Sequence, residues 1–236
     1  MSRPESPVPT ALVTGANRGL GLATTRALAQ RGWHVWLCAR DLEAAQAAAK
    51  SLQNEGLHVT PAELDVTSDA SVDALFGQLD HLDVLINNAG IASDKPVKGG
   101  ATLEIPAALA LEAFNTNTAG PWRTMRHALP RMNARGFGRI VNLSSAMGSI
   151  TQMDTHWPAY RVSKAALNAA TRIFSAEARG NVKINAVCPG WVQTDMGGPR
   201  APRSVAQGVA SILWAVDLGE DGPNGGFFRD GEPMPW

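Results

Sequence analysis

The chain has 236 residues, 44% of them hydrophobic, and its 21 basic residues balance 21 acidic ones. This length fits one α/β domain, and the neutral balance gives no electrostatic case for binding nucleic acid or an anionic membrane surface. No apolar run approaches membrane-spanning length. Residues 1–9 contain three prolines and no apolar core, so we expect a short disordered leader before a domain at 10–236. The default location is the cytoplasm.

Neither the cysteines nor the histidines indicate a metal or disulfide site. Cys38 and Cys188 lie in apolar, strand-like runs and are expected to be small buried hydrophobic residues. The histidines show no metal-ligand spacing, so no metal site is predicted. A set of arginines between the middle helices is interpreted as a solvated helical face of a neutral protein and not as a nucleic-acid site. These are Arg123, Arg126, Arg131, Arg135 and Arg139.

The stretch 11–21 organises the chain. A short apolar run ends in Gly15, Gly19 and Gly21, and an Ala/Leu-rich helical pattern over 22–30 follows at once. A strand, a tight turn and a helix start in succession point free backbone N–H groups and the positive end of the helix dipole at one place, which suits a phosphate. Glycine lets a pyrophosphate approach the backbone. The spacing differs from G-x-G-x-x-G, so a turn without ligand stays open for this motif alone.

Strands and helices alternate along the rest of the chain. Strands are expected at 33–39, 58–64, 83–86, 138–144, 182–187 and 226–228. Helices are expected at 42–54, 68–79, 158–179 and 203–216, and two further helical stretches break near 115–120. Pro61 suggests that the third strand lies toward the sheet edge. The alternation predicts a single α/β domain, a doubly wound parallel sheet of the Rossmann type, with ligand chemistry at the carboxyl ends of its strands.

Polar or glycine-rich clusters stand at those strand ends. Each has a plain alternative, a turn or a helix start, but six plain explanations would have to fall by chance on one edge of the sheet. We therefore predict one crevice formed by them. The clusters are Gly15–Gly21, Ala39-Arg40, Asp65-Val66, Asn87–Gly90, Ser144-Ser145 and Pro189-Gly190.

Tyr160 and Lys164 are the candidate catalytic pair. Residues at i and i+4 stand on one helical face, so the phenol and the ammonium can address one point. A nearby cation favours the ionised phenol, so Lys164 is expected to lower the tyrosine pKa from its reference value of about 10. Tyr160 is the only tyrosine of the chain. The pair alone is a weak motif, and its weight comes from following the strand end at Ser145.

At this point the residues resemble the short-chain dehydrogenase/reductase family along nearly the whole chain. Within that family, the segments 188–198 and 224–231 and the ending Pro235-Trp236 are similar to NADPH-dependent carbonyl reductases and bacterial C-factor-like proteins. The matching signatures are Thr14-Gly15-x-x-x-Gly19-x-Gly21, Asn87-Asn88-Ala89-Gly90, Asn117, Ser145, Tyr160-x-x-x-Lys164 and Pro189-Gly190.

The resemblance implies a role for each catalytic position. Tyr160 would be the general acid for carbonyl reduction, and Lys164 would bind the nicotinamide ribose and lower the tyrosine pKa. Ser145, the second of two serines, would hydrogen-bond the substrate oxygen, and Asn117 would hold a water that passes protons through Lys164. The implied cofactor-binding residues are Gly15, Asn17, Arg18, Gly19, Leu20, Gly21, Ala39, Arg40, Asp65, Val66, Asn87, Ala89, Gly90, Tyr160, Lys164, Pro189, Gly190, Val192 and Thr194.

The end of the second strand predicts NADP(H) as the cofactor. An NAD-selective site places an acidic side chain there to bind the ribose 2′-OH, and this chain has Ala39. Arg40 follows and Arg18 lies in the glycine turn, so two guanidinium groups could clamp a 2′-phosphate. Asp41 could draw Arg40 away or take the 2′-OH itself, but it is expected to start the next helix.

The predicted function is therefore NADPH-dependent reduction of a small ketone or aldehyde. The alternative is a C-factor-like dinucleotide-binding sensor with little or no turnover, which would not require the set Asn117, Ser145, Tyr160 and Lys164. The chain lacks the long insertion that monomeric animal carbonyl reductases carry before their tyrosine, so a homodimer or homotetramer is expected. The substrate pocket is expected between loops 91–101, 146–158 and 191–204, where Trp157 and Trp191 either present an apolar surface or pack in the core.

Overall fold

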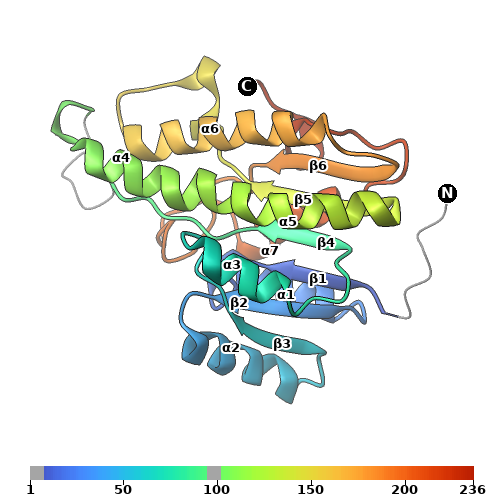
Figure 1. Ribbon diagram of the computed structural model, residues 1–236. Coiled ribbons are helices and arrows are strands. Elements are labelled where there is room, and N and C mark those ends of the chain that lie inside the picture. Colours follow the sequence, from blue (N-terminus) through green and yellow to red (C-terminus); the bar gives the residue numbers. More distant parts are fainter. Residues whose placement is uncertain (1–7, 95–101) are drawn as a thin grey trace.

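The computed structural model describes residues 8–94 and 102–236, and Figure 1 shows their arrangement. One sheet has the strand order β3-β2-β1-β4-β5-β6-β7-β8. Its described strands pair in parallel, except for the antiparallel pair β7 and β8. The strands are β1 Thr10–Val13, β2 His34–Ala39, β3 Val59–Glu63, β4 Val84–Asn87, β5 Phe137–Leu143, β6 Asn181–Val187, β7 Phe227–Arg229 and β8 Glu232–Pro233. The predicted doubly wound parallel sheet is confirmed.

Helices cover both faces of this sheet (Figure 1). Apolar side chains of α1, α2 and α7 form one buried cluster with the sheet, and those of α3, α5 and α6 form the other. The near-continuous apolar strands follow from this burial on both faces. The helices are α1 Gly19–Ala29, α2 Leu42–Asn54, α3 Asp69–Phe76, α4 Ala107–Phe114, α5 Gly120–Arg135, α6 Pro158–Ser175 and α7 Val205–Val216.

Local sequence signals fix the starts of α2 and α7, and the start at Asp41 was expected. The Asp41 carboxylate accepts N–H groups of Glu43 and Ala44 at the start of α2, so it caps that helix. Ser204 and Gln207 form a capping box at α7. β3, which contains Pro61, is the edge strand, as predicted.

Three segments differ from the expected pattern. The predicted break near 115–120 is a π-helical turn, Asn115–Ala119, that joins α4 to α5 without interruption. The helix predicted over 158–179 ends at Ser175, and β8 carried no sequence signal. The predicted leader 1–9 and loop 91–101 lie partly outside the described residues. Within the described part, the Pro9 carbonyl accepts the His34 N–H at 2.9 Å.

Arg139 corrects the interpretation of the arginines as one solvated face. Its side chain is 2% exposed, on β5, and its guanidinium donates to backbone carbonyls of Gly138, Asn181 and Leu218. Burial lowers its pKa to about 10. Arg139 therefore ties the segment after α7 to the amino end of the sheet, where its N–H groups satisfy backbone carbonyls of three segments. Cys38 and Cys188 are free and buried, as predicted.

A stacked histidine pair predicts a loss of stability in mild acid. The rings of His34 and His58 lie 4.2 Å apart, and burial, then the charges of His58 and His81, lower the His34 pKa below 6.5. The unfolded chain therefore binds more protons at and below that ordinary value, so stability falls as pH drops through it. We expect the Tm to be lower at about pH 5 than at about pH 7.

Replacing His58 by Gln should reduce that acid-induced drop in Tm, because it removes a charge that opposes protonation of His34. His156→Gln, at an exposed histidine before α6, is the matched control. If His58→Gln and wild type lose the same Tm between the two pH values, the stacked pair does not cause the effect.

Candidate active site

The glycine turn between β1 and α1 has the geometry of a phosphate cradle. Gly15 and Gly19 have positive φ angles of 60° and 56°, and a Cβ on Gly21 would lie 2.5 Å from the Asn88 amide nitrogen. The α1 N-cap, Arg18, provides no side-chain cap, so the first N–H groups of α1 stay free for an anion. These residues fit the pyrophosphate of a dinucleotide.

Two residues that the sequence argument quoted but gave no role brace this turn. The Thr14 hydroxyl accepts the N–H groups of Asn88 and Ala89 at 3.0 and 2.9 Å. The Asn88 side-chain amide donates to the carbonyls of Thr14 and Gly15, both at 2.8 Å. The signal for them was the Asn-Asn-Ala-Gly cluster at the end of β4, because an amide at a strand end can bond to the next strand's turn.

The predicted adenosine side lies at the ends of β2, β3 and β4. Ala39 is buried and Arg40 exposed. Burial opposes ionisation of Asp65, but hydrogen bonds from Thr67 and the nearby cations Arg40 and Arg123 hold its pKa below the usual value. Arg40 and Asp65 are thus brought to one edge of the crevice.

Asn87 is placed differently from the other predicted cofactor residues. Its Nδ2 donates to Asn142 Oδ1 at 2.8 Å, and its Oδ1 accepts a hydrogen bond from the Thr124 hydroxyl at 2.7 Å. Both polar atoms of the side chain are therefore bonded to other side chains of the protein. A contact between Asn87 and a ribose would therefore come from its backbone.

The catalytic candidates converge at the start of α6. The Ser145 side chain lies close enough to the Tyr160 phenol to lower its pKa in part, and Ser145 Oγ also accepts the Met147 N–H at 3.2 Å. The neighbouring Ser144 hydroxyl is instead buried on Asn168 Oδ1 at 2.6 Å. Lys164 Nζ lies 5.6 Å from the Tyr160 ring centre and donates to the Leu143 carbonyl at 2.7 Å. The structure thus brings Ser145, Tyr160 and Lys164 together, whereas the Ser144 side chain is bonded to Asn168 and lies outside this group.

Asn117 stands behind Lys164 on the π-helical turn. Its amide exchanges two hydrogen bonds of 2.8 Å with the Ile91 backbone and donates to Ser163 Oγ at 2.9 Å. A Cβ on Gly90 would lie 3.2 Å from Asn117 Oδ1 and 3.5 Å from Lys164 Nζ. Glycine therefore leaves open the space between the two side chains. Single π-turns are frequent at functional sites because they re-aim one side chain.

The protonation states differ from the sequence-based expectation. Burial raises the pKa of Tyr160 to about 12, and the Ser145 hydrogen bond opposes this only in part. Burial also lowers the pKa of Lys164 to about 8. The predicted lowering of the tyrosine pKa by Lys164 is therefore wrong for the chain by itself, because burial disfavours both charged forms. The phenol is accordingly held in its proton-donating form.

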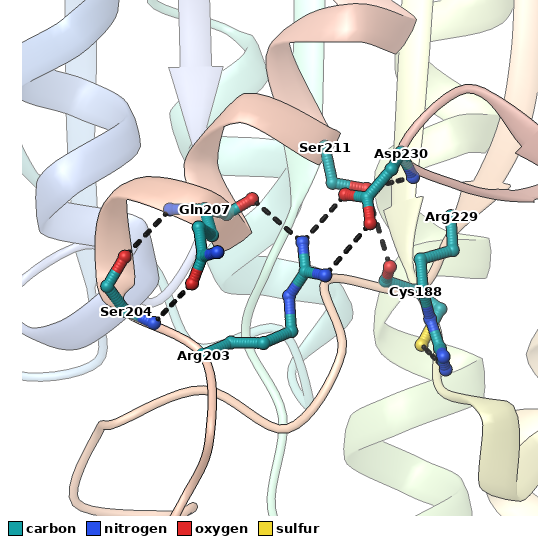
Figure 2. A network of polar contacts seen from close by, with 7 residues as sticks. All are labelled: Cys188, Arg203, Ser204, Gln207, Ser211, Arg229 and Asp230. Carbon is teal, nitrogen blue, oxygen red and sulfur yellow. Dashed lines mark hydrogen bonds and ion pairs between the residues drawn. The ribbon is translucent and has the colours of Figure 1, made fainter.

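The carboxyl end of β6 is held by a network that includes the last strands (Figure 2). Arg203 makes a two-pronged ion pair with Asp230 at 2.7 and 2.8 Å. Ser211 Oγ accepts the Asp230 N–H at 2.9 Å and donates to the Cys188 carbonyl at 3.4 Å. Gly190, with φ of 81°, leaves room for the Arg203 side chain that packs on it. This network fixes the Pro189-Gly190 turn before the loop that carries Thr194.

That loop crosses to the glycine turn on the other side of the crevice. The Thr194 side chain lies 3.6 Å from the Cβ position of Gly19, and Asp195 pairs with Arg18 at 3.1 Å. Both charged side chains are about three-quarters exposed (74% and 75%). Exposed pairs contribute only about 0–1 kcal/mol, so this one does not prevent Arg18 from exchanging Asp195 for a phosphate. The clamp of a 2′-phosphate by Arg18 and Arg40 stays a prediction.

Residues 9–204 match the family described as short chain dehydrogenase. The chain belongs to this family. Its carbonyl reductase relatives include mouse carbonyl reductase [NADPH] 1, which is 33% identical over 279 aligned positions that cover 97% of this chain and 98% of the mouse protein. The alignment is longer than the 236-residue chain, so the mouse protein carries segments that this family member lacks.

Solved structures of the family agree with the fold. The carbonyl reductase Sniffer of D. melanogaster superposes with a TM-score of 0.86 at 32% identity, covering 97% of this chain and all of the fly chain. A single-residue variant of actinorhodin polyketide ketoreductase with NADPH has a TM-score of 0.81 at 30% identity, covering 95% of this chain and 98% of the ketoreductase chain.

Two further features bear on the predicted partners. Across residues 8–94 and 102–236, no helix has both the length and the apolar character needed to span a bilayer. In the same residues, no group of three or more potential metal ligands comes together.

Trp157 is partly exposed and Trp191 is 56% exposed, so neither is a core residue.

Proposed function

We propose that the chain is an NADPH-dependent oxidoreductase that reduces a small ketone or aldehyde to an alcohol. The observation that carries the proposal is the cluster at the start of α6: the Ser145 hydroxyl close to the Tyr160 phenol, with Lys164 on the same helical face. Bound NADPH would supply the hydride. The protonated Tyr160 would donate its proton to the carbonyl oxygen, and Ser145 would hold that oxygen by a hydrogen bond.

Lys164 and Asn117 complete the proposed machinery. Lys164 Nζ and Asn117 Oδ1 face the same space beside Gly90, where a water would resupply the proton that Tyr160 gives away. Lys164 would also hold the nicotinamide ribose. All four residues of the set Asn117, Ser145, Tyr160 and Lys164 are present, which favours an enzyme over a sensor. A sensor would bind the dinucleotide without needing these groups close together.

The proposed cofactor rests on the glycine cradle and on the end of β2. The free N–H groups of α1 suit the pyrophosphate, and Ala39 leaves the 2′-phosphate without a repelling carboxylate. The mouse relative is named for NADPH and the ketoreductase structure contains NADPH, which supports the same choice here.

The test is NADPH consumption against a panel of aldehydes, ketones, diketones and quinones, with the alcohol product identified. We expect carbonyl-dependent loss of NADPH with at least one class. Tight NADPH binding without turnover on the whole panel would favour the sensor instead.

Self-association is also proposed. Helices α4, α5 and α6 carry several large apolar side chains that are exposed, and exposed apolar side chains that lie together mark interaction surfaces: Leu111, Phe114, Trp122, Val162 and Ile173. Light scattering at micromolar concentration should show a dimer or tetramer, because two copies can bury this face against itself.

The control for self-association compares two substitutions that each introduce one negative charge, one among these exposed side chains and one on a different helix. Ile173→Glu should shift the protein to smaller species, whereas Leu42→Glu, at an exposed leucine on α2, should not. A monomeric wild type with full activity would contradict the proposal.

A further inference from the structure

The catalytic helix α6 begins without a cap of its own. Its N-cap residue, Trp157, has a left-handed backbone with φ of 60° and ψ of 47° and makes no side-chain cap. Pro158, the first helical residue, has no N–H. The Tyr160 N–H, which no residue of the helix can satisfy, is therefore an orphan donor directly beneath the catalytic phenol.

Asp94 satisfies that donor from a distant loop. Its Oδ2 accepts the Tyr160 N–H at 3.2 Å, across 66 positions of sequence. The Asp94 side chain is fully buried, with 0% exposure. Its other oxygen, Oδ1, is buried and has no hydrogen-bond partner in the described part of the chain. A buried carboxylate with one oxygen unmatched calls for an explanation.

The placement of Asp94 is tied to the proposed catalytic residues. Its loop follows β4 and is held by Asn117, which exchanges two hydrogen bonds with Ile91. Asn117 also bonds to Ser163, whose hydroxyl donates to the Tyr160 carbonyl at 2.7 Å. Asp94 and Asn117 therefore hold the first turn of α6 from both its N–H and its carbonyl side.

The charge of Asp94 acts on the phenol beside it. Among the described residues, Asp94 and the Cys188 sulfur act electrostatically on the phenol, the Lys164 ammonium lies 5.6 Å from its ring centre, and the Arg229 guanidinium donates to that sulfur at 3.1 Å. Among the described residues no cation pairs with Asp94. A negative charge near a phenol disfavours the phenolate, and it adds to the effect of burial on the Tyr160 pKa.

We infer that Asp94 is a positioning residue for the reduction: it caps the catalytic helix in place of Trp157, and its negative charge adds to the burial that disfavours ionisation of Tyr160. The inference rests on the proposed function for its kinetic consequence but not for its structural one. Asp94 lies outside the set Asn117, Ser145, Tyr160 and Lys164. The inference gives this loop residue a part in positioning Tyr160 and in setting the pH at which its phenol ionises.

The test separates the charge from the cap. Asp94→Asn removes the charge and keeps an oxygen that can accept the Tyr160 N–H, whereas Asp94→Ala removes both. Because Tyr160 is the only tyrosine of the chain, its ionisation can be followed directly, by phenolate absorbance or by NMR of isotope-labelled tyrosine. No turnover is needed for this measurement.

In Asp94→Asn, phenolate should form at a pH lower than in wild type by about half a unit or more. In the same variant the step of the kcat/KM profile that coincides with phenolate formation should move to lower pH by a similar amount, whereas a step near pH 8 from Lys164 should stay in place. Asp73→Asn, an exposed acid on α3, changes the net charge equally and should leave both curves in place. Asp94→Ala should also lose kcat and Tm, because the helix start is uncapped.

Superimposable titration curves of wild type and Asp94→Asn would overturn the inference. Should Asp94→Asn fail to fold, Asp94→Ser, whose hydroxyl can still accept the N–H, replaces it in both measurements. Failure of the proposed function is a separate result: Tyr160→Phe would then reduce carbonyls as well as wild type, whatever the titration shows.

Discussion

Replacing Tyr160 by Phe is expected to lower kcat for carbonyl reduction by a factor on the order of 10²–10⁴, the usual loss when a positioned general acid is removed. The ring stays in place and only the hydroxyl is lost. That hydroxyl is the partner of Ser145 and, with its pKa raised to about 12 by burial, it is protonated throughout the neutral range. The measurement is steady-state kinetics with NADPH and the best carbonyl substrate.

Two controls make this result specific. Tm and NADPH affinity of Tyr160→Phe should stay near wild type, because the backbone contacts of Tyr160 to Asp94 and Ser163 do not involve its hydroxyl. Ser145→Ala should also lose activity, whereas Ser144→Ala should keep it, since the Ser144 hydroxyl lies on Asn168. A folded Tyr160→Phe variant with most of its activity would show that another group supplies the proton.

Replacing Ala39 by Asp is expected to narrow or reverse the preference for NADPH over NADH. The new carboxylate would stand at the end of β2, where it can accept the ribose 2′-OH and repel a 2′-phosphate. Hydrogen bonds to charged groups contribute roughly 1.5–3 kcal/mol, so the ratio of the two kcat/KM values should change by about tenfold to a hundredfold. Steady-state kinetics with both cofactors measure that ratio.

Ala39 is 3% exposed, so the size of the new side chain needs its own control. Ala39→Asn has nearly the same shape without the charge and should change the ratio far less. Arg40→Gln should weaken NADPH alone, because Arg40 is the exposed cation at this strand end. A wild type that prefers NADH would overturn the cofactor assignment.

Much of the fold was predictable because its signals are local. A strand buried on both faces must be apolar almost throughout, so the strands appear as short hydrophobic runs. The glycine turn at Gly15–Gly21 and the cap at Asp41 depend on neighbours within a few residues. The edge position of β3 followed from Pro61, which removes a backbone donor that a central strand would need.

The remaining features depend on contacts between segments far apart in the sequence. The contact of Asp94 with Tyr160 spans 66 positions, and burial of Arg139 depends on the Leu218 carbonyl. The shared helical face of Tyr160 and Lys164 could be inferred from their spacing. The depth of burial, which raises the Tyr160 pKa and lowers the Lys164 pKa, could not.

The central claim is that Tyr160 protonates a carbonyl that receives its hydride from NADPH. Its most direct test uses NADPH with deuterium in place of both hydrogens at C4 of the nicotinamide ring, and mass spectrometry of the product. We expect wild-type protein to give an alcohol with one deuterium on the former carbonyl carbon, and Tyr160→Phe to give almost none under the same conditions. An alcohol without deuterium, or equal labelling by both proteins, would contradict the claim.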